Sequence, residues 1–167
     1  MCIRDSHSIP ETTHDLSRVV YGQGSFLAFA SGRALAYRSQ DGVRWKSAPT
    51  QGLDYAGRVR FLHGRFVAPG PNGTVLFSTT GLRWSTRPTP ATQNLECVTY
   101  GHRRYVAGGD SVIVSSKDGI KWRAVSVPIP VRYLRVINGW FVAIGGPSEV
   151  IISRDALDSV SYTHLPS

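Results

Sequence analysis

Aspartates recur along this chain in one short pattern, and converging carboxylates are the ligands that calcium prefers in proteins. Asp41, Asp118 and Asp155 each follow a serine by two residues, in a pattern that returns about every forty residues. A calcium site needs six or more oxygens that meet at one point. Because these carboxylates belong to separate repeats, we expect them to fix local turns, and the sequence predicts no metal site.

A second set of polar residues lies where the chain turns between apolar runs. Loops on a rigid scaffold commonly carry function. The mixture of acids, amides, arginine and tyrosine suits a sugar or a polar peptide, and it equally suits a solvated loop. The candidate binding residues are Arg33, Asp54, Tyr55, Asn72, Gln93, Asn94, Asp110 and Glu149. No residue set forms a catalytic signature, so we predict neither catalytic residues nor a cofactor.

The formal net charge of +8 invites a search for a nucleic-acid partner. However, 16 of the 19 basic residues are arginines, spread along the chain without a dense cluster. Arg44, Arg83 and Lys121 stand directly before a repeated tryptophan, where alternation along a strand would place them in solvent, opposite the tryptophan. We therefore expect nucleic acid not to be the partner. No apolar run reaches the roughly eighteen residues of a membrane span.

The elements that position these residues are short strands within a repeat of about forty residues. The landmark at 39–45, Ser-Gln-Asp-Gly-Val-Arg-Trp, returns at 78–84 and at 116–122, and residues 153–155 begin a fourth copy that lacks the glycine and tryptophan. In the first copy, apolar runs separated by glycine turns predict strands at 18–21, 25–30, 35–38 and 43–46. We therefore predict an all-β fold, a partial β-propeller of three four-stranded antiparallel blades plus part of a fourth.

The turn motif resembles the Asp box of the BNR-repeat β-propellers, the superfamily of sialidase-like and sortilin-like propellers. Thr80 stands where the second copy should have an aspartate. The resemblance implies a structural role for these residues: the serine and aspartate bond nearby amides, glycine permits the turn and tryptophan covers it. The residues that carry it are Ser39, Asp41, Gly42, Trp45, Ser78, Gly81, Trp84, Ser116, Asp118, Gly119, Trp122, Ser153 and Asp155.

Both ends of the chain resemble translated sequencing-adapter sequence from assembled environmental genes. We expect residues 1–6 to be such an artefact, 7–15 to be a connection from a preceding blade, and 16–155 to be the partial propeller. We expect 156–167 to be a non-native tail, adapter-like from 160. The predicted blades are about 16–48, 55–87, 95–125 and 131–155. The missing blades of a longer parent chain would then be one partner of this piece.

Three functions remain open for such a chain. The preferred hypothesis is a non-catalytic bacterial module, secreted or periplasmic, whose loops bind a protein or a glycan. The first alternative is a fragment of a sialidase-type glycoside hydrolase, which by resemblance needs an arginine triad, a tyrosine with a glutamate, and an acid. The expected Arg-Ile-Pro motif is absent, since residues 8–10 read Ser-Ile-Pro, and Arg58, Arg60 and Arg132 could form a triad only by arbitrary choice. The second alternative is a basic propeller that binds a polyanion.

Overall fold

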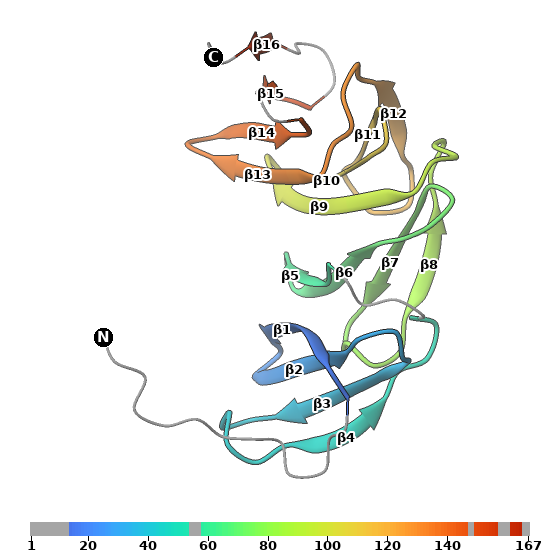
Figure 1. Cartoon of the computed structure of the whole chain (residues 1–167), viewed down its shortest axis with the longest axis vertical. Helices are drawn as coiled ribbons and strands as arrows, with labels where there is room; N and C mark the ends of the chain where they lie inside the picture. Colours follow the sequence, from blue (N-terminus) through green and yellow to red (C-terminus); the bar gives the residue numbers. More distant parts are fainter. Residues whose placement is uncertain (1–13, 54–57, 147–148, 157–160, 165–167) are drawn as a thin grey trace.

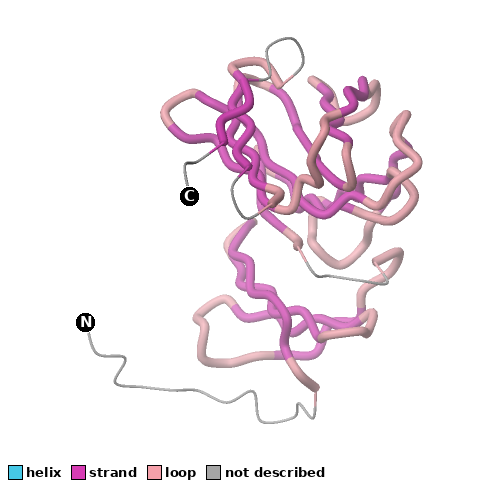
Figure 2. The backbone as a smooth tube through the Cα atoms, turned by 45° about the horizontal axis from the view of Figure 1, so that its top comes forward, coloured by secondary structure: helices cyan, strands magenta, loops and turns pink. Residues whose placement is uncertain are grey.

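The chain folds into four antiparallel sheets that follow one another along an arc (Figure 1). The computed structural model describes residues 14–53, 58–146, 149–156 and 161–164. Strands joined by turns and loops make up the described part, which contains no helix (Figure 2). Accordingly, no described segment offers a helix long and apolar enough to cross a membrane.

Each sheet is a meander of four strands in chain order, as expected for a propeller blade. The first sheet contains β1 (Leu16–Gly22), β2 (Ser25–Ala30), β3 (Leu35–Ser39) and β4 (Lys46–Pro49). The second contains β5 (Arg60–Leu62), β6 (Arg65–Pro69), β7 (Thr74–Ser78) and β8 (Ser85–Pro88). The third contains β9 (Leu95–Gly101), β10 (Arg104–Gly109), β11 (Val112–Ser116) and β12 (Arg123–Ser126). The fourth contains β13 (Tyr133–Ile137), β14 (Trp140–Ile144), β15 (Glu149–Ser153) and β16 (Ser161–His164).

The fourth sheet holds more than the part of a blade that the repeat predicted. Its last strand, β16, pairs antiparallel with β15. Backbone pairing can complete a sheet without the glycine and tryptophan of the repeat, because the ladder uses amide and carbonyl groups that every residue except proline supplies. The expected start of a non-native tail at residue 156 remains a prediction.

The first strand of every sheet lies on the inner side of the arc (Figure 1). β1 contacts β5, β5 contacts β9, and β9 contacts β13, whereas β4, β8 and β12 lie on the outer side. The hairpin between the first two strands repeats the same cross-strand pairing in all four sheets. The paired residues are Tyr21 with Phe26, Phe61 with Phe66, Tyr100 with Tyr105, and Val136 with Phe141.

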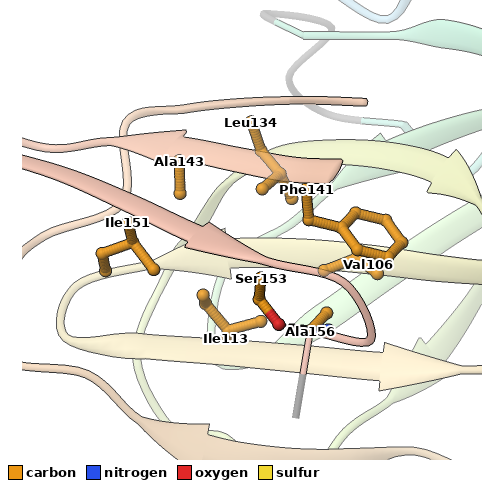
Figure 3. Close-up of a pocket in the computed structure, with 8 residues that line it drawn as sticks. All are labelled: Val106, Ile113, Leu134, Phe141, Ala143, Ile151, Ser153 and Ala156. Carbon is orange, nitrogen blue, oxygen red and sulfur yellow. Dashed lines mark hydrogen bonds between the residues drawn. The ribbon is translucent and has the colours of Figure 1, made fainter. Parts of the chain in front are cut away.

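The core consists of three apolar clusters, one at each interface between neighbouring sheets. Alternation along β6 shows how one strand serves two interfaces: Phe66 and Ala68 pack towards the first sheet, while Val67 between them packs towards the third. The interface of the third and fourth sheets is drawn in Figure 3, where side chains from both sheets face one another. The space left among them is about 10 Å³, the volume of roughly one water probe, so this interface is closely packed.

Tryptophans of the repeat close the interfaces from the outer side. The Trp84 ring lies 6.4 Å from Phe29 of the first sheet, and the Trp122 ring lies 6.4 Å from Phe77 of the second. The prediction that the fourth strand starts before the tryptophan is wrong. β4 begins at Lys46, and Trp45 ends an irregular turn, where its indole N–H donates to the Gly42 carbonyl at 3.0 Å.

Candidate functional site

The serine hydroxyl of each repeat bonds the backbone of its own turn, and in the first and third repeats the aspartate does so too. We call these segments the Ser–Asp turns (39–45, 78–84, 116–122 and 153–156). In the third of them, the amides of Gly119, Ile120 and Lys121 donate at 2.8 Å, the first to the Ser116 hydroxyl and the others to Asp118 Oδ1. The first turn has the same bonds, at 2.8–2.9 Å. These carboxylates are therefore occupied by amides within their own turns.

The residue before the tryptophan belongs to this turn rather than to a strand. Arg44 is exposed, as expected, but its Nε donates to Asp41 Oδ2 at 2.9 Å because the turn bends it back over the carboxylate. The fourth turn lacks the glycine, and Ala156 takes its place: Ala156 has a φ of 65°, and its amide donates to the Ser153 hydroxyl at 2.9 Å. Figure 3 shows these two residues at the edge of the closely packed interface.

The second turn has longer hydrogen bonds than the first and third, because a hydroxyl stands in for the carboxylate. The amides of Leu82 and Arg83 lie 3.3 and 3.5 Å from Thr80 Oγ1, longer than the bonds to Asp118. We expect Thr80→Asp to raise Tm by about 2–4 °C, since ionised acceptors form stronger hydrogen bonds. Differential scanning calorimetry checks this. The reciprocal change Asp118→Thr should lower Tm, and equal Tm values for all three chains would contradict the explanation.

Acid should weaken the Ser–Asp turns in a defined pH range. Amide donors from Ile120 and Lys121 lower the pKa of Asp118 from 3.8 to about 2, and those of Arg44 and Val43 lower the pKa of Asp41 further. A depressed folded-state pKa gives stability that is present above 3.8 and is lost as pH falls towards 2. We expect Asp118→Asn to flatten the dependence of the urea midpoint on pH across this range. Ile120→Ala, which removes no ionisable group from the same turn, is the control and should keep that dependence.

The remaining turns meet on the opposite side of the sheets, which we call the loop face. It consists of the turns at 31–34, 70–73 and 110–111 and the connections at 50–53 with 58–59, at 89–94 and at 127–132. Antiparallel strands place successive turns at alternate ends of a sheet. These segments therefore lie at the end opposite the Ser–Asp turns and opposite the hairpins that join the first two strands of each sheet. Five of the predicted binding residues lie in these segments: Arg33, Asn72, Gln93, Asn94 and Asp110.

A cavity of about 610 Å³ opens on the loop face, lined by the connection between the first and second sheets, by the second sheet and by the start of the third. We call it the loop-face cavity. Of the predicted binding residues, the structure brings Asn72 and Asn94 together on its wall, where Asn94 Oδ1 accepts a hydrogen bond of 3.0 Å from the Asn72 amide. The described residues that line it are Gly52, Leu53, Arg58, Pro69, Gly70, Pro71, Asn72, Thr74, Leu76, Thr86, Asn94, Leu95 and Glu96.

Backbone hydrogen bonds hold the connection at 89–94 against the second sheet and so shape this wall. The Gly73 amide donates to the Gln93 carbonyl at 2.7 Å, and the Gly73 carbonyl accepts from Thr89 at 2.9 Å. The Leu95 amide donates to the Gly70 carbonyl at 3.0 Å. Because these bonds use main-chain groups, apolar periodicity along the sequence could not indicate them.

The other predicted binding residues do not join Asn72 and Asn94. Arg33 and Asp110 are exposed in the turns of the first and third sheets, and Glu149 begins β15; none of the three lines the loop-face cavity. Gln93 is exposed, and its side-chain oxygen accepts from the neighbouring Thr92 amide at 3.2 Å. The predicted residues Asp54 and Tyr55 lie outside the described residues.

A second cavity, of about 200 Å³, lies beside the inner strands, and five arginines line it. We call it the arginine hollow; its arginines are Arg18, Arg58, Arg60, Arg132 and Arg135. Arg58 also lines the loop-face cavity, so the two cavities share a wall. The three arginines considered for a triad are thus brought together, and Arg18 and Arg135 join them.

Sequence reasoning missed this convergence, although the repeat register contains a signal for it. Arg18 and Arg58 each precede their hairpin turn by five residues, and Arg60 and Arg135 precede theirs by three. Positions two apart share one face of a strand, and the inner strands of successive sheets are neighbours. Aligning the hairpin turns would therefore have grouped these arginines.

Known metal-ligand chemistry has no counterpart in the described residues. They contain no group of three or more His, Cys, Asp or Glu side chains placed to hold a metal ion. Cys97 lines the arginine hollow, but it is buried, and burial raises the pKa of its thiol to about 12. The thiol is accordingly protonated at neutral pH.

No protein-family model and no curated protein matches the sequence. Among solved structures, the chain is similar to YCF48 bound to D1 peptide, with a TM-score of 0.66 and 15% identity over 94% of this chain and 55% of that chain. It is also similar to the WD40 β-propeller domain of Doa1, with a TM-score of 0.68 and 11% identity over 90% of this chain and 54% of that one. These likenesses show the β-propeller fold, and the chain spans about half the length of either structure.

Proposed function

We propose that this partial β-propeller is a non-catalytic module that binds a protein segment through its loop face. The observation that carries the proposal is the loop-face cavity of about 610 Å³. Its size falls within the usual range for ligand sites, and it combines apolar walls from Leu53 and Leu76 with amides from Asn72 and Asn94. A short peptide offers the same combination of apolar side chains and hydrogen-bonding amides.

The likeness to known structures supports a protein segment as the ligand rather than a glycan. One similar propeller, YCF48, was solved bound to a D1 peptide, and binding peptide segments is thus within reach of the fold. A glycan remains the second ligand class that the polar loops would suit. For the family, we propose the BNR or Asp-box propellers, because in all four turns the serine hydroxyl accepts a hydrogen bond from the amide three residues later. The proposed module covers residues 16–155, with blades at about 16–48, 55–87, 95–125 and 131–155.

The proposal is tested by selecting peptides from a random phage-displayed library on the immobilised chain. Peptides recovered should bind in solution, and Thr86→Trp should weaken them by at least about tenfold by filling the cavity that Thr86 lines. Arg87→Trp is the matched control, since Arg87 is the next residue of β8 and does not line the cavity. Both residues are exposed, so neither change should unfold the chain.

Three results would decide between the alternatives. Peptides weakened by Thr86→Trp alone support the loop-face proposal. Equal weakening by both tryptophan variants, or none by either, contradicts it, because the peptides then bind elsewhere. A library that yields no binder, together with a glycan array that yields sugars sensitive to Thr86→Trp, replaces the protein ligand with a glycan.

A further inference from the structure

The geometry points to the arginine hollow as the site for a carboxylate of an acidic peptide segment. This inference rests on the proposed peptide binding at the loop face and specifies the chemistry of the ligand. The hollow adjoins the loop-face cavity through Arg58, so a peptide seated in the larger cavity has an acid-binding pocket next to it.

Charge in the hollow is strongly one-sided. Five guanidinium groups line it, and no carboxylate is among its described lining residues. Glu96 stands on the wall of the neighbouring cavity, where its Oε2 lies 3.9 Å from Arg58 Nη2. Burial, followed by the positive charges of Arg135 and Arg18, lowers the pKa of Arg60. An incoming anion would relieve this repulsion between like charges.

Hydrogen-bonding capacity restricts the ligand to acceptors. Guanidinium groups donate and cannot accept. Three of them already donate to backbone carbonyls: Arg60 to Val98 at 3.1 Å, Arg135 to Leu134 at 3.2 Å, and Arg58 to Arg132. A sugar needs acceptors for its hydroxyl protons, and among the described side chains that line the hollow Tyr133 supplies the only hydroxyl. An oxyanion needs donors alone, so it matches the hollow and a neutral sugar does not.

Size then favours a single acidic group over an extended polyanion. A space of about 200 Å³ admits one acidic side chain with its neighbouring atoms. Nucleic acid binds through many phosphates along a broad basic surface. Arg44, Arg83 and Arg123 do not extend the hollow into such a surface, since they lie in or beside the Ser–Asp turns at the opposite end of the sheets. Glu96 beside Arg58 shows that a carboxylate fits this environment.

The test uses the full chain and a fluorescent peptide rich in aspartate and glutamate, with fluorescence anisotropy as the readout. The comparison peptide replaces every acid with its amide, which keeps shape and removes charge. We expect the acidic peptide to bind at least about tenfold more tightly than its amide counterpart. Arg60→Gln and Arg135→Gln should each weaken the acidic peptide by about tenfold, and Arg135→Lys should weaken it less, because lysine keeps the charge but not the fork.

Arg87→Gln is the matched control, because it removes the same charge from an exposed position on β8 outside the hollow. It should change the affinity by less than about twofold. Equal affinity for the two peptides, or equal weakening by Arg87→Gln and Arg60→Gln, overturns the inference. Duplex DNA that binds more tightly than the peptide, with a steep salt dependence, also overturns it in favour of a polyanion site. Circular dichroism confirms that each variant is folded.

Failure of this inference can be told apart from failure of the proposed function. If selected peptides depend on Thr86 but not on Arg60 or Arg135, the loop face binds peptides and the arginine hollow does not bind their acids. If the acidic peptide depends on both arginines and is indifferent to Thr86→Trp, the hollow binds carboxylates and the loop-face cavity is not the seat of the peptide.

Discussion

Replacing Phe66 with alanine is expected to lower the free energy of unfolding by about 3–5 kcal/mol. Phe66 is 1% exposed and belongs to the apolar cluster between the first and second sheets. Its ring also lies 4.9 Å from that of Phe61 on the neighbouring strand. The change leaves a cavity at an interface on which both sheets depend, because a single four-stranded blade cannot bury both of its faces. Urea denaturation followed by circular dichroism measures the loss.

The matched control is Ile120→Ala, which removes a large apolar side chain from a turn where it is 66% exposed. That change should cost less than about 0.5 kcal/mol. A similar loss for both variants would show that Phe66 does not carry the interface. A second outcome to examine is the shape of the transition, since loss of coupling between neighbouring units of a repeat array can split one transition into two.

Replacing Gly73 with alanine should destabilise the chain by about 2–4 kcal/mol, the second largest effect expected. Gly73 has a φ of 66°, and a Cβ there would lie against the Ala91 carbonyl oxygen, closer than any van der Waals contact. The backbone of the 89–94 connection must then move, which breaks the hydrogen bonds from Gly73 to Gln93 and from Thr89 to Gly73. Peptide affinity at the loop face should fall with stability, because the same connection forms the cavity wall.

Gly64→Ala separates the two causes of this effect. Gly64 has a φ of 77°, but a Cβ there meets nothing within 4 Å. The backbone strain alone should cost about 1 kcal/mol. If Gly73→Ala and Gly64→Ala were equally stable, the contact with Ala91 would not contribute to the loss of stability. The 89–94 connection would then be able to move away from the added Cβ without cost.

The repeat predicted most of the fold because each local signal recurs in register. Glycine turns, β-branched runs and the Ser–Asp turn all point to the same four-stranded unit, and such agreement across levels specifies a structure strongly. The error at Trp45 has a local cause. Tryptophan favours strands, but the indole hydrogen bond to the Gly42 carbonyl holds it in the turn, so β4 begins one residue later.

The candidate site could be predicted only in part, because it depends on how sheets meet. Asn72 lies in the β6–β7 turn and Asn94 in the connection before β9, and a hydrogen bond from the Asn72 backbone amide to Asn94 Oδ1 joins them. The arginines of the hollow are far apart in sequence and meet through the curvature of the arc. Arg33 and Asp110 occupy equally plausible loops, yet the structure leaves them apart from the cavity. The position of a turn in the repeat predicts that its residues lie on the loop face. Which of those residues line the cavity follows only from the contacts in the folded chain.

The hairpins between the first two strands of each sheet contact the corresponding hairpin of the next sheet in the chain. Gln23 donates to the Gly64 carbonyl 41 residues later, the His63 ring stacks on Tyr100, and His102 bonds the Gly139 carbonyl 37 residues later. On a ribosome that adds about 5–20 residues per second, each completed hairpin would wait roughly 2–8 s for its partner. During translation, the newest sheet is therefore the one whose interface is still open, and pauses in synthesis would prolong the exposure of its apolar face to chaperones.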